Sequence, residues 1–274
     1  MSIFHLNIDK CIKCGICVNL CPASVLSMTD NGPAGTEKSE RFCIGCGHCV
    51  ASCPQEALDN DKAPLSGQKP LIQYPVLDAE TAETFLRSRR SIRRFKKREV
   101  SREDMRKLLN VARCAPSASN SQGISYIVVD SEEIRRKLTA LTIDWMDQKV
   151  QEGDAYARSY GYGLFVKLYR KTGKDLILRD APSIVVAYAP NDFSMRRDSS
   201  CMAMAYMELY ATAMGLGSCW MGYMENCARD GYQPLLDLLG IPQDMVVTAV
   251  VGVGYPTYRF YRMADRNPLD VKFI

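Results

Sequence analysis

Eight of the twelve cysteines stand in two runs near the start of the chain, and their spacing suits thiolate ligands of an iron–sulfur cluster. The first run is CIKCGICVNLCP (Cys11–Pro22) and the second is CIGCGHCVASCP (Cys43–Pro54). Both read C-x2-C-x2-C-x3-C-P, in which three sulfurs wrap one [4Fe–4S] cluster and the fourth ligates the other. We therefore expect two clusters with crossed ligand sets: Cys11, Cys14, Cys17 and Cys53 for one, and Cys43, Cys46, Cys49 and Cys21 for the other.

Zinc ribbons and disulfides are the competing interpretations of these cysteines. Zinc ribbons usually show two C-x2-C pairs and not two four-cysteine runs, each closed by proline. Gly15, Gly45 and Gly47 stand inside the runs, where the missing side chain lets the backbone approach a cluster closely. His48 lies between two of the ligands; an exposed turn residue is the simpler reading, and tuning of the cluster potential is the alternative.

The composition is that of an ordinary globular protein whose positive charge is local. The 274 residues carry a net charge of +4, and basic residues gather at Arg87–Arg98 and Arg259–Arg266. Local clusters of this kind favour a bound anion over a nucleic-acid surface. The N-terminus lacks the pattern of a signal peptide, and no apolar run approaches the length of a membrane span. Twelve cysteines without a signal predict a reducing, cytoplasmic location, and exposed clusters suggest anaerobic conditions.

The chain is expected to form two domains, residues 1–66 and 67–274. Up to about residue 60 the two runs make an internal repeat that is too short for a large hydrophobic core, so the clusters should hold it together. Pro64, Pro70 and Pro75, with Gly67, then mark a linker, and we place the boundary near Ser66.

The second part alternates helical and strand-like patterns. Asp78 and Ser101 are expected to cap helices, the second of which ends before Pro116. Strands are expected at 124–130, 183–189 and 245–254, and a strand or a strand-edge loop at 218–224. Helices are expected at 198–214 and 229–239, and an extended tail from Tyr255. Residues 131–180 should form an irregular, partly lid-like helical insertion, broken at Gly153, Gly161 and Gly163.

Three stretches of this second part could bind a cofactor. The first stretch is Arg89-Arg90-Ser91-Ile92-Arg93, whose guanidinium groups and hydroxyl could bind a phosphate. The alternative is a solvated basic helix end, where the positive charges interact favourably with the helix dipole. The second stretch is Ala115–Gln122 (APSASNSQ), which contains several small hydroxyl and amide side chains that could bind a cofactor. The alternative is an ordinary polar loop. The third stretch is Gly215–Gly222 (GLGSCWMG), whose small residues would let main-chain N–H groups contact the edge of a flat ring. The alternative is a glycine that ends a helix, followed by a core strand.

Together these stretches resemble the nitroreductase family of FMN enzymes over about residues 78–274. The order R-x-S-x-R, P-S-x-x-N, G-L-G and V-G-x-G-Y-P with a basic tail is preserved, and an N-terminal two-cluster ferredoxin domain is a known arrangement in that family. The resemblance implies an α+β fold, with a mixed sheet flanked by helices, that forms a homodimer binding FMN at its interface. The implied flavin-binding residues are Arg89, Arg90, Ser91, Arg93, Pro116, Ser117, Ala118, Asn120, Trp220, Met221, Gly222, Arg259 and Arg262, with Ser117 and Asn120 reaching the flavin from the partner chain.

The missing residue types exclude other chemistries. Both histidines, His5 and His48, lie in the first part, so the second part can hold neither a Ser–His triad nor a histidine metal site. Gly252-Val253-Gly254 does not lead into a helix, which argues against a Rossmann fold. No catalytic side chain is required if a flavin does the redox chemistry, and Arg93 is the candidate cation near flavin N1. Four cysteines remain, with buried core thiols as the default: Cys114, Cys201, Cys219 and Cys227. For Cys219 the alternative is contact with the flavin pocket.

The leading functional hypothesis is an FMN-dependent oxidoreductase fed through its own clusters. Its electrons would come from a ferredoxin-like protein or NAD(P)H and would reduce a small electron-poor organic acceptor such as a nitroaromatic, a quinone or an enone. The alternatives are an electron-transfer module that serves a protein partner, and an iron–sulfur redox sensor. No nucleic acid or membrane partner is expected.

Overall fold

The structure is a computed structural model that describes residues 2–274, and it divides into two compact units. The first unit runs to Val76 and also takes in Ala118–Ser121; the second comprises Leu77–Ser117 and Gln122–Ile274. The division therefore falls after Val76 and not at the expected boundary between residues 66 and 67. The reason is local, because Leu65–Gly67 forms a 3-10 turn, η1, and Gln68 Nε2 donates to the Ala63 carbonyl at 2.9 Å, which keeps the chain on the first unit past Ser66.

The first unit has little regular structure. Strand β1 (Phe4–Leu6) pairs antiparallel with β4 (Leu58–Asn60), and β2 (Leu26–Thr29) pairs with β3 (Gly32–Gly35). Three helices of four residues each complete it: α1 (Ile16–Asn19), α2 (Ser39–Phe42) and α3 (His48–Ala51). Gly15 and Gly47 precede α1 and α3 in the left-handed region, at φ 77° and 72°, where a residue with a Cβ is disfavoured.

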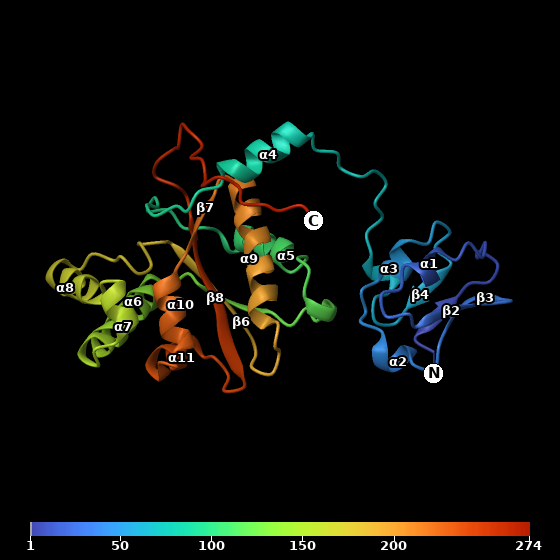
Figure 1. Ribbon diagram of the computed structural model, residues 1–274, viewed down its shortest axis with the longest axis horizontal. Coiled ribbons are helices and arrows are strands. Elements are labelled where there is room, and N and C mark those ends of the chain that lie inside the picture. The colour runs from blue at the N-terminus through green and yellow to red at the C-terminus, as the bar shows by residue number, and fades with distance from the viewer. Residues whose placement is uncertain (1) are drawn as a thin grey trace. The chain divides into compact units, whose positions relative to one another are not determined.

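A four-stranded sheet forms the centre of the second unit (Figure 1). The strand order is β5 (Ser125–Val129), β6 (Ser183–Pro190), β8 (Met245–Gly254), β7 (Gly217–Trp220), and all three pairings are antiparallel. Ser91 adds a parallel bridge to Ser218 at the β7 edge. The combination of this sheet with flanking helices confirms the α+β class, although its named strands are antiparallel and the only parallel pairing within residues 2–274 is the bridge at Ser91.

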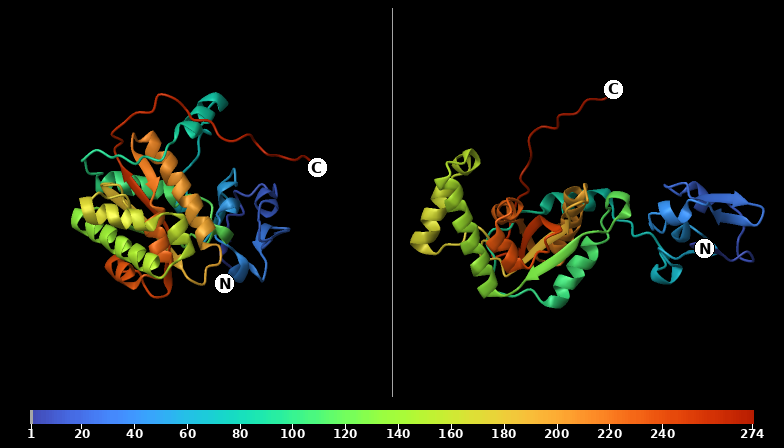
Figure 2. Two further views of the ribbon diagram at one scale, coloured as in Figure 1. Left: turned by 60° about the vertical axis from the view of Figure 1, so that its left-hand side comes forward. Right: turned by 90° about the horizontal axis from the view of Figure 1, so that it is seen from below.

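Helices cover both faces of this sheet (Figures 1 and 2). Successive strand residues point to opposite faces, so Val185 packs with one set of helices and Ile184 with the other. One face carries α5 (Arg102–Ala112) and α9 (Arg196–Ala213). The other carries α6 (Glu132–Gln151), α7 (Ala155–Ser159), α8 (Tyr162–Thr172), α10 (Gly222–Arg229) and α11 (Gln233–Leu239).

The expected helix caps are present. Asp78 caps α4 (Ala79–Ser88) by accepting from Thr81 N at 2.8 Å, and Ser101 caps α5 by accepting from Asp104 N at 3.0 Å. Each side-chain oxygen satisfies a main-chain N–H that has no partner within the helix.

Two local expectations were wrong. Gly153 and Gly161 do separate α6, α7 and α8, but Gly163 lies inside α8 because its neighbours supply a regular apolar face. Residues 222–224 are not strand: they begin α10, so β7 ends at Trp220.

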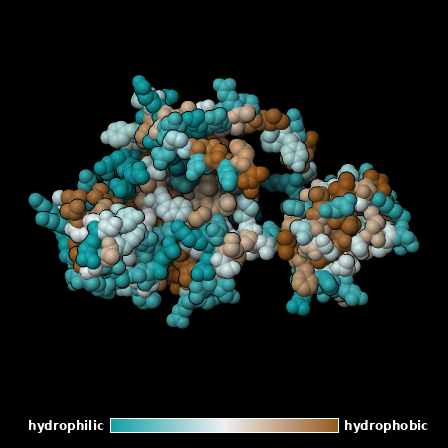
Figure 3. Space-filling model, viewed as in Figure 1, coloured by the Kyte–Doolittle hydropathy of each residue, from teal (hydrophilic) through white to brown (hydrophobic). Residues whose placement is uncertain are grey.

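Large apolar side chains remain exposed on both units, and Figure 3 shows several of them on the viewed face. In the second unit they concentrate in the C-terminal tail, at Tyr258, Phe260, Tyr261, Met263, Leu269, Val271, Phe273 and Ile274. Within residues 2–274, no helix combines the length and the apolar character that crossing a membrane requires.

Candidate functional site

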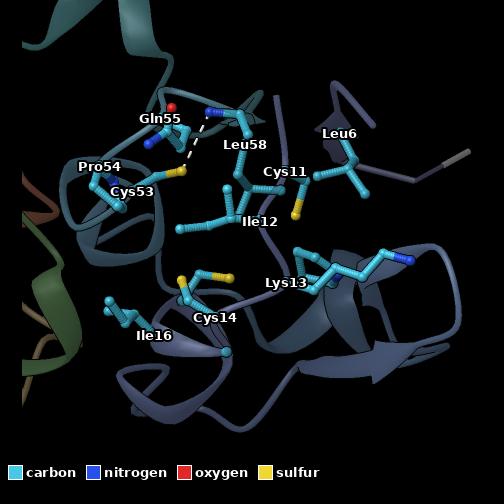
Figure 4. Close-up of a pocket in the computed structure, with 14 residues that line it drawn as sticks. Leu6, Cys11, Ile12, Lys13, Cys14, Ile16, Cys53, Pro54, Gln55 and Leu58 are labelled. Atoms are coloured by element: carbon cyan, nitrogen blue, oxygen red, sulfur yellow. Dashed lines mark hydrogen bonds between the residues drawn. The ribbon is translucent and has the colours of Figure 1, made fainter. Parts of the chain in front are cut away.

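The eight cysteines of the two runs line two separate hollows in the first unit. Cys11, Cys14, Cys17 and Cys53 line the first, and Cys21, Cys43, Cys46 and Cys49 line the second. Figure 4 shows the sulfurs of Cys11, Cys14 and Cys53 around one space that Ile12 and Leu58 also border. The structure thus brings together the two crossed sets that the spacing predicts, and four thiols around each hollow suit one four-iron cluster.

The surroundings of these thiols suit bound iron. Burial raises the pKa of Cys17 and of Cys49, so each thiolate needs a compensating positive charge, which iron would supply. Main-chain N–H groups already point at two of the sulfurs: Val25 N lies 3.4 Å from Cys21 Sγ, and Ala57 N lies 3.2 Å from Cys53 Sγ. Donors of this kind stabilise negative charge on a ligating sulfur.

In the second unit, the segment after α4 runs beside β7. Ile92 N donates to the Ser218 carbonyl at 2.8 Å, next to the bridge between Ser91 and Ser218. Gly217 makes this approach possible, because a Cβ there would lie 2.3 Å from Ile92 Cγ1. Two of the three predicted stretches, Arg89–Arg93 and Gly215–Gly222, therefore meet at one edge of the sheet.

Arg89 is held in place at this edge. Its Nη1 lies 3.6 Å from Glu208 Oε1, and the same carboxylate oxygen accepts from Ser218 Oγ at 2.8 Å. The Arg89 side chain is 26% exposed, so part of its guanidinium fork remains available to a ligand. One segment thus offers two arginines and a hydroxyl, which suits an anionic group such as a phosphate.

An open pocket of about 270 Å³ lies at the same edge. Four of the predicted flavin-binding residues line it, namely Arg93, Trp220, Met221 and Gly222, together with Cys219. Sequence reasoning missed the rest of the lining: Tyr156, Tyr160, Leu176, Ile177, Arg179, Tyr223 and Asn226. Tyrosine rings and two arginines, with no acidic residue among the lining side chains, favour a planar or anionic ligand.

Arg179 is the most informative of the missed residues. It and Asp180 have φ values of 59° and 54°, in the left-handed region that residues with a Cβ seldom adopt. Burial raises the pKa of Cys219 and of Tyr223, and the guanidinium of Arg179 opposes the rise in both cases. Arg179 therefore extends the positive potential of Arg93 along the pocket, from a strained turn of the kind often found at functional sites.

A buried carboxylate supports the tryptophan of this pocket. Glu225 lies in the first turn of α10 and is 2% exposed. It accepts from the indole Nε1 of Trp220 and, at 2.5 Å, from Arg197 Nη1. Arg197 Nη1 also donates to the Thr248 carbonyl on β8 at 2.8 Å. Glu225 thus fixes the orientation of the Trp220 ring.

The third predicted stretch is divided between the two units. Pro116 is exposed, and Ser117 Oγ accepts from Gln122 N at 3.0 Å within the second unit. Ala118 and Asn120 belong to the first unit. There Asn120 Nδ2 lies 3.0 Å from the Ile44 and the Gly45 carbonyls, so its amide is engaged with the loop of the second cysteine run.

The predicted tail arginines lie apart from the pocket lining. Arg259 and Arg262 are exposed, and Arg259 stacks over the ring of Tyr261 at 5.8 Å. Arg90 lies over the ring of Phe260 at 5.4 Å, so it packs with the tail. Of the four cysteines outside the runs, Cys219 and Cys227 are buried as expected, Cys201 is half-buried, and the expectation for Cys114 was wrong, because it sits exposed just after α5.

Comparison with known proteins agrees with this division into two parts. The family model described as "Nitroreductase family" matches residues 86–255, and that described as "4Fe-4S dicluster domain" matches residues 10–58. A putative NADH dehydrogenase/NAD(P)H nitroreductase of Archaeoglobus fulgidus is 30% identical over 66% of this chain and 90% of its own length.

Two solved structures are similar to this chain. A nitroreductase with bound FMN from Bacteroides fragilis has a TM-score of 0.57 and 18% identity, covering 70% of this chain and 98% of its own. An FMN-dependent nitroreductase from Clostridium difficile has a TM-score of 0.51 and 27% identity, with the same coverage of both chains. The family model spans well over half of the present sequence, so the chain belongs to the nitroreductase family of oxidoreductases and carries a 4Fe–4S dicluster domain at its N-terminal end.

Proposed function

We propose that this protein is an FMN-dependent oxidoreductase that receives electrons through two [4Fe–4S] clusters and reduces a small electron-poor organic acceptor. The observation that carries the proposal is the pocket beside β7, where predicted flavin-binding residues meet aromatic side chains and a second arginine. One of the two similar structures holds bound FMN and the other is of an FMN-dependent nitroreductase, which supports the choice of cofactor. FMN, when bound, takes up electrons singly and gives them up singly or as a hydride.

Different residues of this chain would contact different parts of the flavin and the acceptor. Arg89 and Ser91 would bind the phosphate end, with Arg89 pre-oriented by Glu208. Arg93 would place positive charge near the ring and so favour its reduced, anionic form. Trp220, held by Glu225, would orient the acceptor and exclude water from the pocket.

The proposal is tested by anaerobic titration of the purified protein. NADH, NADPH and a chemically reduced ferredoxin are added separately while the flavin and iron–sulfur absorbances are followed. Nitroaromatic, quinone and enone acceptors are then supplied for steady-state turnover. We expect the reduced ferredoxin to bleach the clusters and the flavin and to support turnover. The name of the Archaeoglobus relative supports NAD(P)H as the second candidate donor.

Two results would change the assignment. Reduction of the flavin without turnover of any acceptor class would favour an electron-transfer module that serves a protein partner. A purified protein without flavin would contradict the proposal outright. The pocket would hold the flavin in either case, so turnover of a small acceptor is the result that distinguishes the enzyme from the module.

Arg89→Ala is expected to weaken FMN binding by about 10- to 100-fold. The substitution removes a charge-assisted hydrogen bond to phosphate, which contributes about 1.5–3 kcal/mol. The measurement is the dissociation constant of FMN, from fluorescence recovery on dilution of the flavoprotein. Arg87→Ala is the matched control, because Arg87 lies two residues away and pairs only with exposed carboxylates. Equal FMN affinity in the two variants would contradict the assignment.

Arg179→Gln is expected to raise the KM for carboxylate-bearing acceptors by about tenfold and to leave KM for neutral acceptors unchanged. Losing one cation from the pocket removes about 1.4 kcal/mol of attraction for an anion. Steady-state kinetics with a nitrobenzoate and with the corresponding neutral nitrobenzene measure the difference. Arg170→Gln is the control, because Arg170 pairs with Asp147 on the surface. A uniform loss with both acceptors would place Arg179 in flavin binding instead.

We further propose a homodimer in the cytoplasm. The exposed apolar side chains of the C-terminal tail would be covered by a second copy of the chain. Eight of the twelve cysteines are proposed cluster ligands, and free thiol ligands suit a reducing compartment. Sedimentation equilibrium of the flavin-loaded protein should give twice the chain mass, and a monomer at micromolar concentration would contradict the dimer.

A further inference from the structure

The two cysteine runs are repeats of each other, and the structure keeps their symmetry over most of their length. Leu26 and Leu58, each five residues after the fourth cysteine of its run, are both buried. The residue before each of them, Val25 or Ala57, directs its main-chain N–H at the sulfur of that fourth cysteine. In these respects the two hollows offer a cluster the same surroundings.

His48 lines the second hollow where the first has Ile16, but His48 is exposed. The buried polar groups differ between the repeats seven residues after the fourth cysteine. The first repeat has Met28 there, 42% exposed, and the second has Asn60, 1% exposed. Asn60 lines the second hollow, and its Nδ2 lies 3.6 Å from Cys43 Sγ. Methionine has no polar hydrogen, so Met28 cannot make the corresponding hydrogen bond to a sulfur of the first hollow.

The orientation of the Asn60 amide follows from its other contact. Asn60 Oδ1 accepts from Lys62 N at 2.9 Å, which leaves Nδ2 as the atom that faces Cys43. Asp59 holds the same turn, because its Oδ1 accepts from the main-chain N–H groups of Asn60 and Leu65 at 2.7 and 2.8 Å. The donor is therefore buried, fixed and aimed at a predicted cluster ligand.

Lysines near the hollows do not produce a comparable difference. Lys13 lines the first hollow and directs Nζ to the Asp30 carbonyl at 2.6 Å. Lys62 directs Nζ to the Cys43 carbonyl at 2.9 Å beside the second. An exposed ammonium thus lies near each hollow, and charges exposed to water are screened. The buried Asn60 amide has no counterpart.

We propose that Asn60 is a positioning residue that makes the second hollow, formed by Cys21, Cys43, Cys46 and Cys49, the site of higher reduction potential. One-electron reduction of a cluster adds negative charge that spreads onto its sulfurs. A fixed N–H donor stabilises the reduced form more than the oxidised form and so raises the potential. An electron from a one-electron donor would therefore rest at the second hollow. This proposal rests on the two-cluster assignment of the proposed function.

The test is a redox titration of the iron-loaded, full-length protein, followed by electron paramagnetic resonance under anaerobic conditions. Asn60→Met places in the second repeat the residue that the first repeat has at the equivalent position, Met28. We expect it to lower the higher of the two midpoint potentials by at least 59 mV, a tenfold change for a one-electron couple, and to leave the lower one in place. Asn19→Met, on the exposed face of α1 and outside the lining of both hollows, makes the same chemical change and should shift neither potential.

Unchanged potentials in Asn60→Met, or a shift confined to the lower one, would overturn the proposal. If Asn60→Met loses iron, Asn60→Ser is measured in its place, because a shorter polar side chain withdraws the donor without adding bulk. Unchanged potentials, or a shift confined to the lower potential, would overturn the proposal for this variant too. Iron analysis separates this outcome from failure of the proposed function. About eight irons per chain with unmoved potentials refutes only the role of Asn60, whereas the absence of clusters refutes the assignment beneath it.

Discussion

Removing the iron from this protein is expected to unfold residues 2–76 and to leave the second unit folded. The hydrophobic core cluster of the first unit, within residues 2–76, has seven buried residues, two of which, Cys17 and Cys49, are predicted cluster ligands. Its sheets are two-stranded and its helices have four residues, and such elements are marginal on their own in water. The binding free energy of the clusters would therefore be most of the folding free energy of this unit.

Two kinds of experiment measure this effect. Calorimetry of the protein before and after iron chelation should show loss of one transition and persistence of another. Hydrogen exchange should show loss of protection across residues 4–60 only. The single substitutions Cys17→Ser and Cys49→Ser should each reproduce part of the loss, one at each hollow, and should abolish turnover driven by reduced ferredoxin. Cys114→Ser is the control, because Cys114 is exposed and outside both runs. Native protection in the iron-free protein would contradict the prediction.

The cysteine runs were readable from the sequence because cluster ligation depends on local spacing. The x2 gaps and the closing proline identify a ligand set without knowledge of the fold. The crossed pairing of Cys21 and Cys53 is equally a property of the motif, and the structure places each sulfur at the hollow of the other run. The same holds for the caps Asp78 and Ser101, whose partners lie three residues away.

The missed residues depend on contacts between distant parts of the chain. Arg179, Tyr156 and Asn226 reach one pocket from a turn and from two helices, and no spacing rule connects them. The sequence predicts a strand or a strand-edge loop at the start of α10, because Met221–Met224 continues an apolar run. Only the packing of α10 on β8 and α6 distinguishes a buried helix from a strand there. Asn60 could have been noticed by aligning the two repeats, because the polar residue replaces a methionine.

Replacing Glu225 with Ala is expected to lower the free energy of unfolding of the second unit by about 3 kcal/mol. Glu225 is 2% exposed, and its removal leaves the Trp220 indole N–H and part of the Arg197 guanidinium without their acceptor. Breaking a buried ion pair from one side costs about 3–5 kcal/mol, and the low end applies because the Arg197 side chain is 43% exposed. Chemical denaturation, monitored by circular dichroism, measures the loss.

Two further variants separate the buried contact from general effects of losing a glutamate. Glu133→Ala removes a carboxylate that pairs with Lys137 on the surface of α6, and it should change stability by less than about 0.5 kcal/mol. Glu225→Gln keeps the shape and an acceptor oxygen for the indole but weakens the contact with Arg197, so its stability should fall between those of Glu225→Ala and the parent protein. Because Trp220 lines the pocket, Glu225→Ala should also weaken acceptor binding under conditions where the variant is fully folded. Equal stability of Glu225→Ala and Glu133→Ala would show that Arg197 and Trp220 find other partners and that Glu225 does not hold this edge of the sheet.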